Sequence, residues 1–382
     1  MRGFQISEFQ NRLKRAQLLM ADKKLDALFL TSETDVRYFT GYLTRFWESP
    51  TRPWYLLVPQ TGKPVAVIPS IGAALMSKTW IDDIRTWSSP DLTDDGLTLL
   101  RDTIDDCLGQ RPVIGVPSGH ETHIRMPHAD FLRLHKLCPS VRFTTDHNIL
   151  RRLRLIKSDA EINKIKTACA IAGRAFDRVP EIAAEGVPLS DVFRKFQMLC
   201  LDEGADWVPY VAGGKGPMGY DDVISPATDE PLLKKDIMML DTGLVHDGYF
   251  CDFDRNFAIG RPSAEVSAAW QTLLEATEAG QDAAKAGNRA AYIYYAIDTV
   301  LTGGKGGGAA GRLGHGLGMQ LTEWPSLIPD DDTELEQGMV ITIEPSLTLS
   351  DGSVLVHEDD FVITAKGAQQ LSPMAPRNLW VI

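Results

Sequence analysis

The stretch IMMLDTGLVHDGYFCDFDRNFAI, residues 237–259, holds two strand-like runs on either side of an Asp-Gly dipeptide at 247–248. Asp-Gly is a strong signal for a two-residue β-hairpin loop. In that register Asp241 lies opposite Asp254, and Asp252 shares their face because side chains alternate along a strand. A three-residue loop would put Asp241 on the other face. The stretch therefore predicts three carboxylates on one face of an apolar hairpin, where they need a partner.

Three further residues of the same chemical kind follow along the chain. His315 lies between two glycines, Glu344 ends an apolar run, and Glu358 stands among strand residues. Alone, His315 also fits a turn or a hydrogen-bonded core histidine, and Glu344 fits a chance glutamate at a strand end. For the hairpin carboxylates the alternative is a solvated polar face. Carboxylates brought close together cannot all stay ionised without cations between them. If they converge, the sequence predicts a metal site with these ligands: Asp241, Asp252, His315, Glu344 and Glu358.

Composition limits the class of protein. The chain has 382 residues, 44% of them hydrophobic and 24% charged, and a formal net charge of −12. That length suits two domains, and the acidity disfavours a nucleic-acid partner. No stretch is apolar enough for a membrane span, and residues 1–20 resemble an amphipathic helix more than a signal peptide. Five scattered cysteines predict reduced, mostly buried thiols and a cytoplasmic location.

Alternating strand and helix signals divide the chain into two predicted domains, residues 1–152 and 153–382. The first is predicted to be an α/β domain around a central sheet, and it has no glycine-rich phosphate loop after its first strand. The second begins with a capping box at Ser158 and Glu161. Lys305, within GGKGGG, has no following Ser or Thr and predicts a loop rather than a phosphate site. The expected elements are strands at 25–30, 54–58, 65–69, 113–116, 236–259, 338–347 and 353–364, and helices through 21 and at 71–80, 93–108, 126–137, 158–184, 190–203, 263–286 and 288–301.

The order and spacing of these motifs resemble the creatinase, prolidase and methionine-aminopeptidase family with its pita-bread fold. The resemblance rests on Asp241 with Asp252 eleven residues later, GHGLG at 314–318, GMVITIEP at 338–345, Glu358-Asp359, and the junction LRLIKSDAEI. It implies an N-terminal creatinase-like domain, a C-terminal pita-bread catalytic domain and a homodimer. It also implies two divalent ions bound by the five residues above, with a bridging hydroxide as nucleophile. An oxygen-rich set with one histidine suits Mn, Co, Fe or Zn.

Four departures from the peptidase branch put cleavage of ordinary Xaa-Pro peptides in doubt. The residues that replace its accessory histidines are Tyr220, Gly311 and Thr322, and Val356 replaces an arginine that is common two residues before the last glutamate. Asp254 replaces the usual threonine, and we expect it to act as a general base or to orient a ligand, or else to pair with Arg255.

Substrate contacts are predicted from arginine and aromatic residues. The segment RFWESPTRPW, 45–54, is rich in both, and Arg45 or Arg52 is expected to bind a substrate carboxylate. The resemblance to creatinase-like dimers implies that this segment reaches the active site of the partner subunit. Aromatic faces suit a cationic or amidine group, although core packing is the alternative for any one aromatic. The predicted substrate-binding residues are Arg45, Trp47, Arg52, Trp207, Tyr210, Tyr220, Thr322 and Trp324, and the predicted catalytic residues are Asp254, Glu344 and Tyr220.

The function expected from this set is a metal-dependent hydrolase that cleaves the C–N bond of an amide or amidine in a small zwitterion, of the ectoine or creatine type. An Xaa-Pro dipeptidase or aminopeptidase is the first alternative. A lyase acting on dimethylsulfoniopropionate is less favoured because Gly243 stands where that branch has a second aspartate. A metal-free binding protein is disfavoured because all five ligands are present.

Overall fold

The computed structural model describes residues 2–49, 52–306 and 311–382. The chain forms two compact units, residues 1–154 and 155–382, and the division predicted from sequence, between 152 and 153, lies within helix α6 (Ile149–Leu155). Parts of two predicted segments, 50–51 in the arginine-aromatic stretch and 307–310 in the glycine-rich stretch, lie outside the described residues.

The first unit is built on a six-stranded mixed sheet with the order β4-β3-β2-β1-β5-β6. Strand β1 is buried along its whole length and pairs antiparallel with β2 and parallel with β5. The strands are β1 (Ala27–Leu30), β2 (Tyr55–Pro59), β3 (Val65–Pro69), β4 (Asp83–Trp87), β5 (Val113–Val116) and β6 (Arg142–Thr145). The α-helices that precede α6 are α1 (Ile6–Lys23), α2 (Glu33–Thr40), α3 (Ala73–Met76), α4 (Leu97–Cys107) and α5 (His128–Leu137). The predicted α/β organisation is confirmed.

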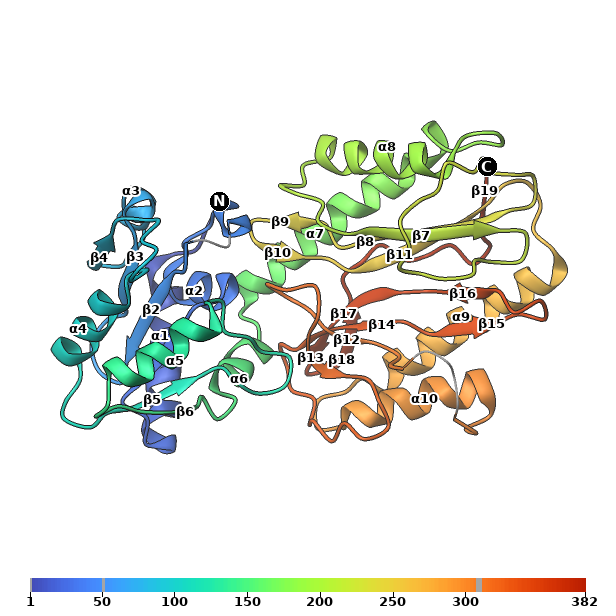
Figure 1. Ribbon diagram of the computed structural model, residues 1–382. Helices are drawn as coiled ribbons and strands as arrows, with labels where there is room; N and C mark the ends of the chain where they lie inside the picture. The colour runs from blue at the N-terminus through green and yellow to red at the C-terminus, as the bar shows by residue number, and fades with distance from the viewer. Residues whose placement is uncertain (1, 50–51, 307–310) are drawn as a thin grey trace. The chain divides into compact units, whose positions relative to one another are not determined.

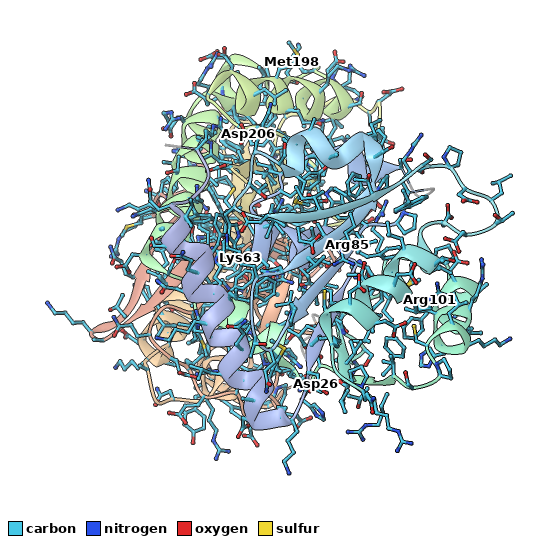
Figure 2. The ribbon with its side chains drawn as sticks, turned by 90° about the vertical axis from the view of Figure 1, so that its left-hand side faces the viewer. Asp26, Lys63, Arg85, Arg101, Met198 and Asp206 are labelled. Carbon is cyan, nitrogen blue, oxygen red and sulfur yellow. The ribbon has the colours of Figure 1, made fainter. Side chains whose placement is uncertain are left out.

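One helix of this unit is shorter than predicted. The helix expected over 71–80 ends at Met76, and the Thr79 hydroxyl donates to the Met76 carbonyl at 2.7 Å. Trp80 is buried and its indole donates to the Phe39 carbonyl at 2.7 Å, which draws the chain back to the sheet. Beyond it lies Arg85 of β4, which is labelled in Figure 2. Arg85 pairs with Asp83 and with Asp106 of α4.

The second unit contains two larger sheets, β19-β11-β8-β7 and β13-β12-β14-β17-β18. Helices α7 and α8 lie along the four-stranded sheet, and α9 and α10 lie beside the five-stranded one (Figure 1). The helices are α7 (Asp159–Asp177), α8 (Leu189–Asp202), α9 (Ala264–Ala283) and α10 (Ala290–Thr302). The strands of the first sheet are β7 (Val211–Gly216), β8 (Ile237–Thr242), β11 (Phe253–Ala258) and β19 (Trp380–Val381), and those of the second are β12 (His315–Gly316), β13 (Glu323–Ser326), β14 (Val340–Ile343), β17 (Asp359–Thr364) and β18 (Gly367–Gln370).

The predicted hairpin forms in the two-residue register. His246 of β9 (Val245–His246) pairs with Tyr249 of β10 (Tyr249–Phe250), and farther along Asp241 pairs with Asp254. The two loop residues, at 247 and 248, have φ values of 48° and 82°, as a type I′ turn requires. The hairpin therefore fixes which face of the sheet carries the acidic residues.

The two long strands predicted near the C-terminus are each interrupted at a candidate ligand. Residues 338–347 form β14 and β15 (Ser346–Thr348), with Glu344 in the break. Residues 353–364 form β16 (Val354–Val356) and β17, with Glu358 in the break. Asp252 likewise lies between β10 and β11. At such breaks the backbone N–H groups lack a ladder partner and must find another acceptor.

A buried ion pair joins the two strands that follow these breaks. Arg255 of β11 and Asp359 of β17 are 2–3% exposed, and their side chains lie 2.9 Å apart. Arg255 also donates to the carbonyl oxygens of Glu358 and Pro373. Because both charges are buried, each needs the other: a buried charge without its partner is costly.

The remaining sequence expectations concern cysteines and membrane spans. None of the five cysteines is in a disulfide; Cys107 is half-buried and the other four are buried. Within the described residues, no helix is long and apolar enough to cross a membrane.

Replacing Arg255 by Met is expected to lower the free energy of unfolding by about 3 kcal/mol, because Asp359 then stays buried without its cation. The double variant Arg255→Met/Asp359→Leu is expected to be less destabilised than the single one. Urea denaturation followed by circular dichroism measures both. The control is Arg194→Met, an arginine whose side chain is 70% exposed. An Arg255→Met variant as stable as the control would contradict the prediction.

Candidate metal centre

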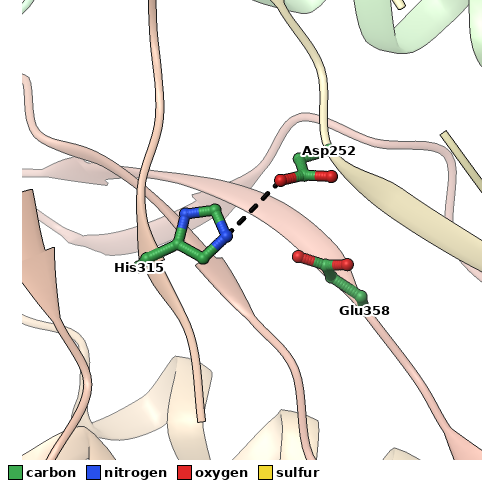
Figure 3. Close-up of side chains that lie close together, drawn as sticks. All are labelled: Asp252, His315 and Glu358. Atoms are coloured by element: carbon green, nitrogen blue, oxygen red, sulfur yellow. Dashed lines mark ion pairs between the residues drawn. The ribbon is translucent and has the colours of Figure 1, made fainter. Parts of the chain in front are cut away.

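Three side chains from separate segments meet at the centre of the second unit. Ligand atoms of Asp252, His315 and Glu358 lie within 4.8 Å of one another, and all three residues are buried. The His315 Nε2 atom is 3.4 Å from an Asp252 carboxylate oxygen (Figure 3). The three come from the β10–β11 break, from β12 and from the β16–β17 break.

His315 is held so that one ring nitrogen faces the carboxylates. Gly314 has a φ of 141°, and a side chain there would collide with the Thr342 carbonyl, so the flanking glycine is required. The His315 amide donates to the Thr342 hydroxyl at 3.2 Å, and Nδ1 lies 2.8 Å from the Gly316 carbonyl. With Nδ1 donating there, Nε2 carries the lone pair that a metal ion takes.

Asp241 and Glu344 adjoin this triad. The charge of Glu344 acts on Asp241, Asp252 and Glu358, so its carboxylate lies near all three. Three of the five residues proposed as ligands thus meet within 4.8 Å, Asp241 and Glu344 lie near them, and the role of all five as ligands stays a prediction.

Burial and the charges of neighbouring groups shift the pKa values of these side chains. Burial, followed by the charge of Glu344, raises the pKa of Asp241 to about 7, against a hydrogen bond from Tyr210. Burial and the neighbouring carboxylates raise the pKa of Asp252 and of Glu358 well above their usual range. Burial, together with Arg312, lowers the pKa of His315 to about 4. The imidazole is therefore neutral, as a metal ligand must be.

The donor set fits divalent metal ions. Asp241 Oδ1 and Glu358 Oε1 are buried and have no hydrogen-bond partner among the described residues. Buried carboxylate oxygens without partners are costly unless a cation meets them. Oxygen donors with a single imidazole suit Mn, Co, Fe or Zn.

Asp254 and Asp360 connect the two ligand-bearing breaks through reciprocal hydrogen bonds. The Glu358 amide donates to Asp254 at 2.6 Å, and the Asp252 amide donates to Asp360 at 3.0 Å. Asp254, the acceptor for Glu358, lies two residues after Asp252. Asp360, the acceptor for Asp252, lies two residues after Glu358. Asp254 does not use Arg255 as its partner, because that guanidinium contacts the Asp254 carbonyl and pairs with Asp359.

Tyr220 lies in a hydrogen-bonded chain that leads to Asp254. It is 1% exposed, and its hydroxyl donates to Asn256 at 3.3 Å and accepts from the Val356 amide at 2.6 Å. Asn256 in turn donates to Asp254 at 2.9 Å. The Tyr220 hydroxyl therefore supports Asp254 through Asn256, and its predicted roles in catalysis and substrate binding stay predictions.

The other predicted contacts of the second unit fall into two groups. Burial, followed by the charges of Asp241 and Asp252, raises the pKa of Tyr210, so Tyr210 lies near these carboxylates. Thr322 accepts from Arg312 at 3.3 Å, the arginine that is next to Glu344. Trp324 instead packs partly buried against the core formed with α9 and α10, and its indole donates to Thr333 at 2.8 Å, which is the core-packing alternative. Trp207 is partly buried, and its backbone bridges to Val245.

Arg45, Trp47 and Arg52 belong to the first unit. Arg45 pairs with Glu48 at 3.2 Å and Arg52 donates to Ser49 at 3.0 Å. Trp47 is buried against Trp54, with ring centroids 5.5 Å apart. Their predicted role in substrate binding stays a prediction.

A cavity of about 750 Å³ lies beside Glu344. Arg312 is on its wall, and the Arg312 Nε atom is 3.6 Å from the Glu344 carboxylate. Sequence reasoning missed both Arg312 and Asp360. Their signals were the position of Arg312 three residues before His315, and the i, i+2 spacing of Glu358 and Asp360, which repeats that of Asp252 and Asp254.

Comparison with known proteins supports the sequence resemblance. The family model "Metallopeptidase family M24" matches residues 163–365, and the model "Creatinase/Prolidase N-terminal domain" matches residues 12–156. The first match contains all five candidate ligands.

Relatives match over all or part of the chain. A probable dipeptidase PepE from Mycobacterium bovis is 28% identical over 100% of this chain and 98% of its own length. An Xaa-Pro dipeptidase from Pyrococcus furiosus is 30% identical over 59% of this chain and 65% of its own. The crystal structure of dipeptidase PepE from Mycobacterium ulcerans superposes with a TM-score of 0.85 at 27% identity, covering 100% of this chain and 99% of that one. The chain belongs to metallopeptidase family M24, with an N-terminal domain of the creatinase/prolidase type.

Proposed function

We propose that this protein is a dinuclear-metal hydrolase that cleaves the C–N bond of a small zwitterionic amide. One observation carries the proposal: Asp252, His315 and Glu358 converge within 4.8 Å, beside carboxylate oxygens that have no hydrogen-bond partner among the described residues. Family membership agrees with hydrolysis.

In the proposed reaction the chain supplies the metal ligands and their supports. Asp241, Asp252, His315, Glu344 and Glu358 would hold the two ions. When bound, the ions lower the pKa of a water molecule and polarise the scissile carbonyl. Tyr210, near Asp241, and Thr322, bonded to Arg312, would orient the substrate.

Dipeptides are the first substrate class to consider, because the relatives above are named dipeptidases. A non-peptide zwitterion of the ectoine or creatine type is the second candidate. The observation that favours it is the replacement of accessory polar groups: Thr322 hydrogen-bonds Arg312, and Val356 contributes an apolar side chain to the cavity. A cytoplasmic homodimer, with manganese as one suitable metal, also belongs to this proposal.

Metal-stripped protein reconstituted with Mn, Co or Zn is expected to bind about two ions per chain. Glu358→Gln and Asp252→Asn are each expected to lower that number, because each removes a charged donor from the buried cluster. Elemental analysis after gel filtration gives the stoichiometry. Glu181→Gln, at an exposed glutamate, is the control and should bind like the wild type. A content near zero in the reconstituted wild type would favour the metal-free binding protein.

Reconstituted protein is expected to hydrolyse members of a panel of Xaa-Pro and other dipeptides, ectoine and creatine, and to lose activity on chelation. Product formation is followed by mass spectrometry. Turnover of dipeptides alone supports the first substrate class, and turnover of ectoine or creatine alone supports the second. Metal-loaded protein that hydrolyses none of them contradicts the proposal.

We also infer that Asp254 and Asp360 are positioning residues for the metal ligands. Asp360→Leu removes the acceptor of the Asp252 amide and is expected to weaken metal affinity about 10- to 100-fold. Asp360→Asn keeps one acceptor oxygen and is expected to lose less. Isothermal titration calorimetry measures the affinity, and thermal unfolding of the metal-free variants separates this effect from a general loss of stability. Equal affinities for Asp360→Leu and wild type would rule out the role.

A further inference from the structure

The cavity beside Glu344 is lined mainly by apolar and aromatic side chains, with a few charged ones. Eight of its lining side chains are apolar or aromatic, and they come from α10, β15, β16 and the loops near residues 223 and 313. They are Val223, Ile224, Tyr294, Leu301, Leu313, Leu347, Val354 and Val356. A volume of about 750 Å³ is in the range of sites that bind small molecules. The body of the ligand is therefore small and largely apolar.

Arg312 is the one cation among the described residues that line this cavity. Its side chain is 36% exposed, with Nε 3.6 Å from Glu344 and Nη2 3.3 Å from the Thr322 hydroxyl. Nη1 has no hydrogen-bond partner among the described residues. A guanidinium carries five N–H donors, so Arg312 has donors left for a ligand.

The two other acidic side chains of the cavity are already engaged. Asp222 accepts from the amides of Ile224 and Ser225. Asp298 accepts from the Thr302 hydroxyl and the Gly306 amide. These aspartates and Glu344 give the cavity negative charge, so a doubly charged anion is disfavoured there. A singly charged carboxylate matches one planar guanidinium.

We propose that Arg312 binds the carboxylate of the substrate, with the apolar remainder of the substrate in this cavity. The inference rests on the proposed hydrolase function, and it names the group that sets specificity. Arg312 differs from Arg45 and Arg52 in lying on the wall of the cavity next to a candidate metal ligand, within the unit that carries the ligands. The scissile bond of a bound acid would then lie toward Glu344.

A purely structural role for Arg312, as the ion-pair partner of Glu344, predicts a different outcome. Loss of that role would disturb Glu344 and weaken metal binding and the turnover of every substrate. Loss of a carboxylate contact would weaken only ligands that carry a carboxylate. Comparing an acid with its amide therefore separates the two roles.

The first test is direct binding to the metal-loaded protein, measured by isothermal titration calorimetry. The probes are 4-methylpentanoate and 4-methylpentanamide, which differ in charge but hardly in shape. The acid is expected to bind about tenfold more tightly than the amide, as expected for a charged hydrogen bond. Arg312→Gln should remove that difference and leave the amide unchanged. Arg194→Gln, at an exposed arginine of the same unit, should keep it.

Several outcomes would overturn the assignment. They are no binding of the acid, equal binding of acid and amide in the wild type, or a preference that survives in Arg312→Gln because the carboxylate binds the metal ions. A preference lost in Arg52→Gln but kept in Arg312→Gln would transfer the role to the first unit. These readouts need no turnover, so they remain decisive if no substrate of the panel is hydrolysed.

A kinetic test follows if the panel yields a substrate. Arg312→Gln is expected to raise KM about tenfold or more for the free acid, and to change KM little for the corresponding amide. Arg312→Lys should recover part of the loss, since it keeps the charge without the planar fork. Unchanged metal stoichiometry in both variants is required, and equal losses for acid and amide would identify the structural role instead.

Discussion

Two crossed hydrogen bonds between strand breaks organise the centre of this protein. The amides of Asp252 and Glu358 donate to Asp360 and Asp254, at 3.0 and 2.6 Å. Each amide stands where strand pairing stops, so it needs an acceptor from outside the ladder. Because the acceptors are carboxylates from the opposite strand, the positions of the two ligand-bearing residues depend on each other. Arg255 and Asp359 join the same strands by a buried ion pair.

The arrangement concentrates negative charge in the interior, and that charge is the main energetic constraint on the fold. Asp252, Asp254 and Glu358 are buried, and burial together with neighbouring carboxylates, Asp241 among them, raises the pKa of each well above the usual range. Arg255 offsets part of this charge. The unpartnered oxygens of Asp241 and Glu358 indicate that divalent cations offset the rest, so metal binding and stability of the second unit are coupled.

Chemistry and specificity are separated in space on this scaffold. The acidic cluster with His315 fits the metal ions of an M24 enzyme, while the neighbouring cavity presents apolar walls and Arg312. Glu344 belongs to both, since it lines the cavity and its charge acts on Asp252 and Glu358. A substrate with a carboxylate and an apolar body would thus be recognised by side chains that are not metal ligands. The same metal chemistry can serve different substrates when only these groups change.

The sequence by itself determined the features that depend on local pattern. The Asp-Gly turn fixed the hairpin register and the opposition of Asp241 and Asp254, and the motif order revealed the family and the five converging residues. The limits of the strands at Glu344 and Glu358 were not predicted, because breaks in pairing depend on partners distant in the chain. Only the tertiary structure decided that Tyr220 supports Asn256, that Trp324 joins the core and that Arg312 lines a cavity. The physical reason is that the hydrophobic period and turn chemistry act within a few residues, whereas the partner of a side chain is set by contacts between distant segments, such as Tyr220 and Val356, 136 residues apart.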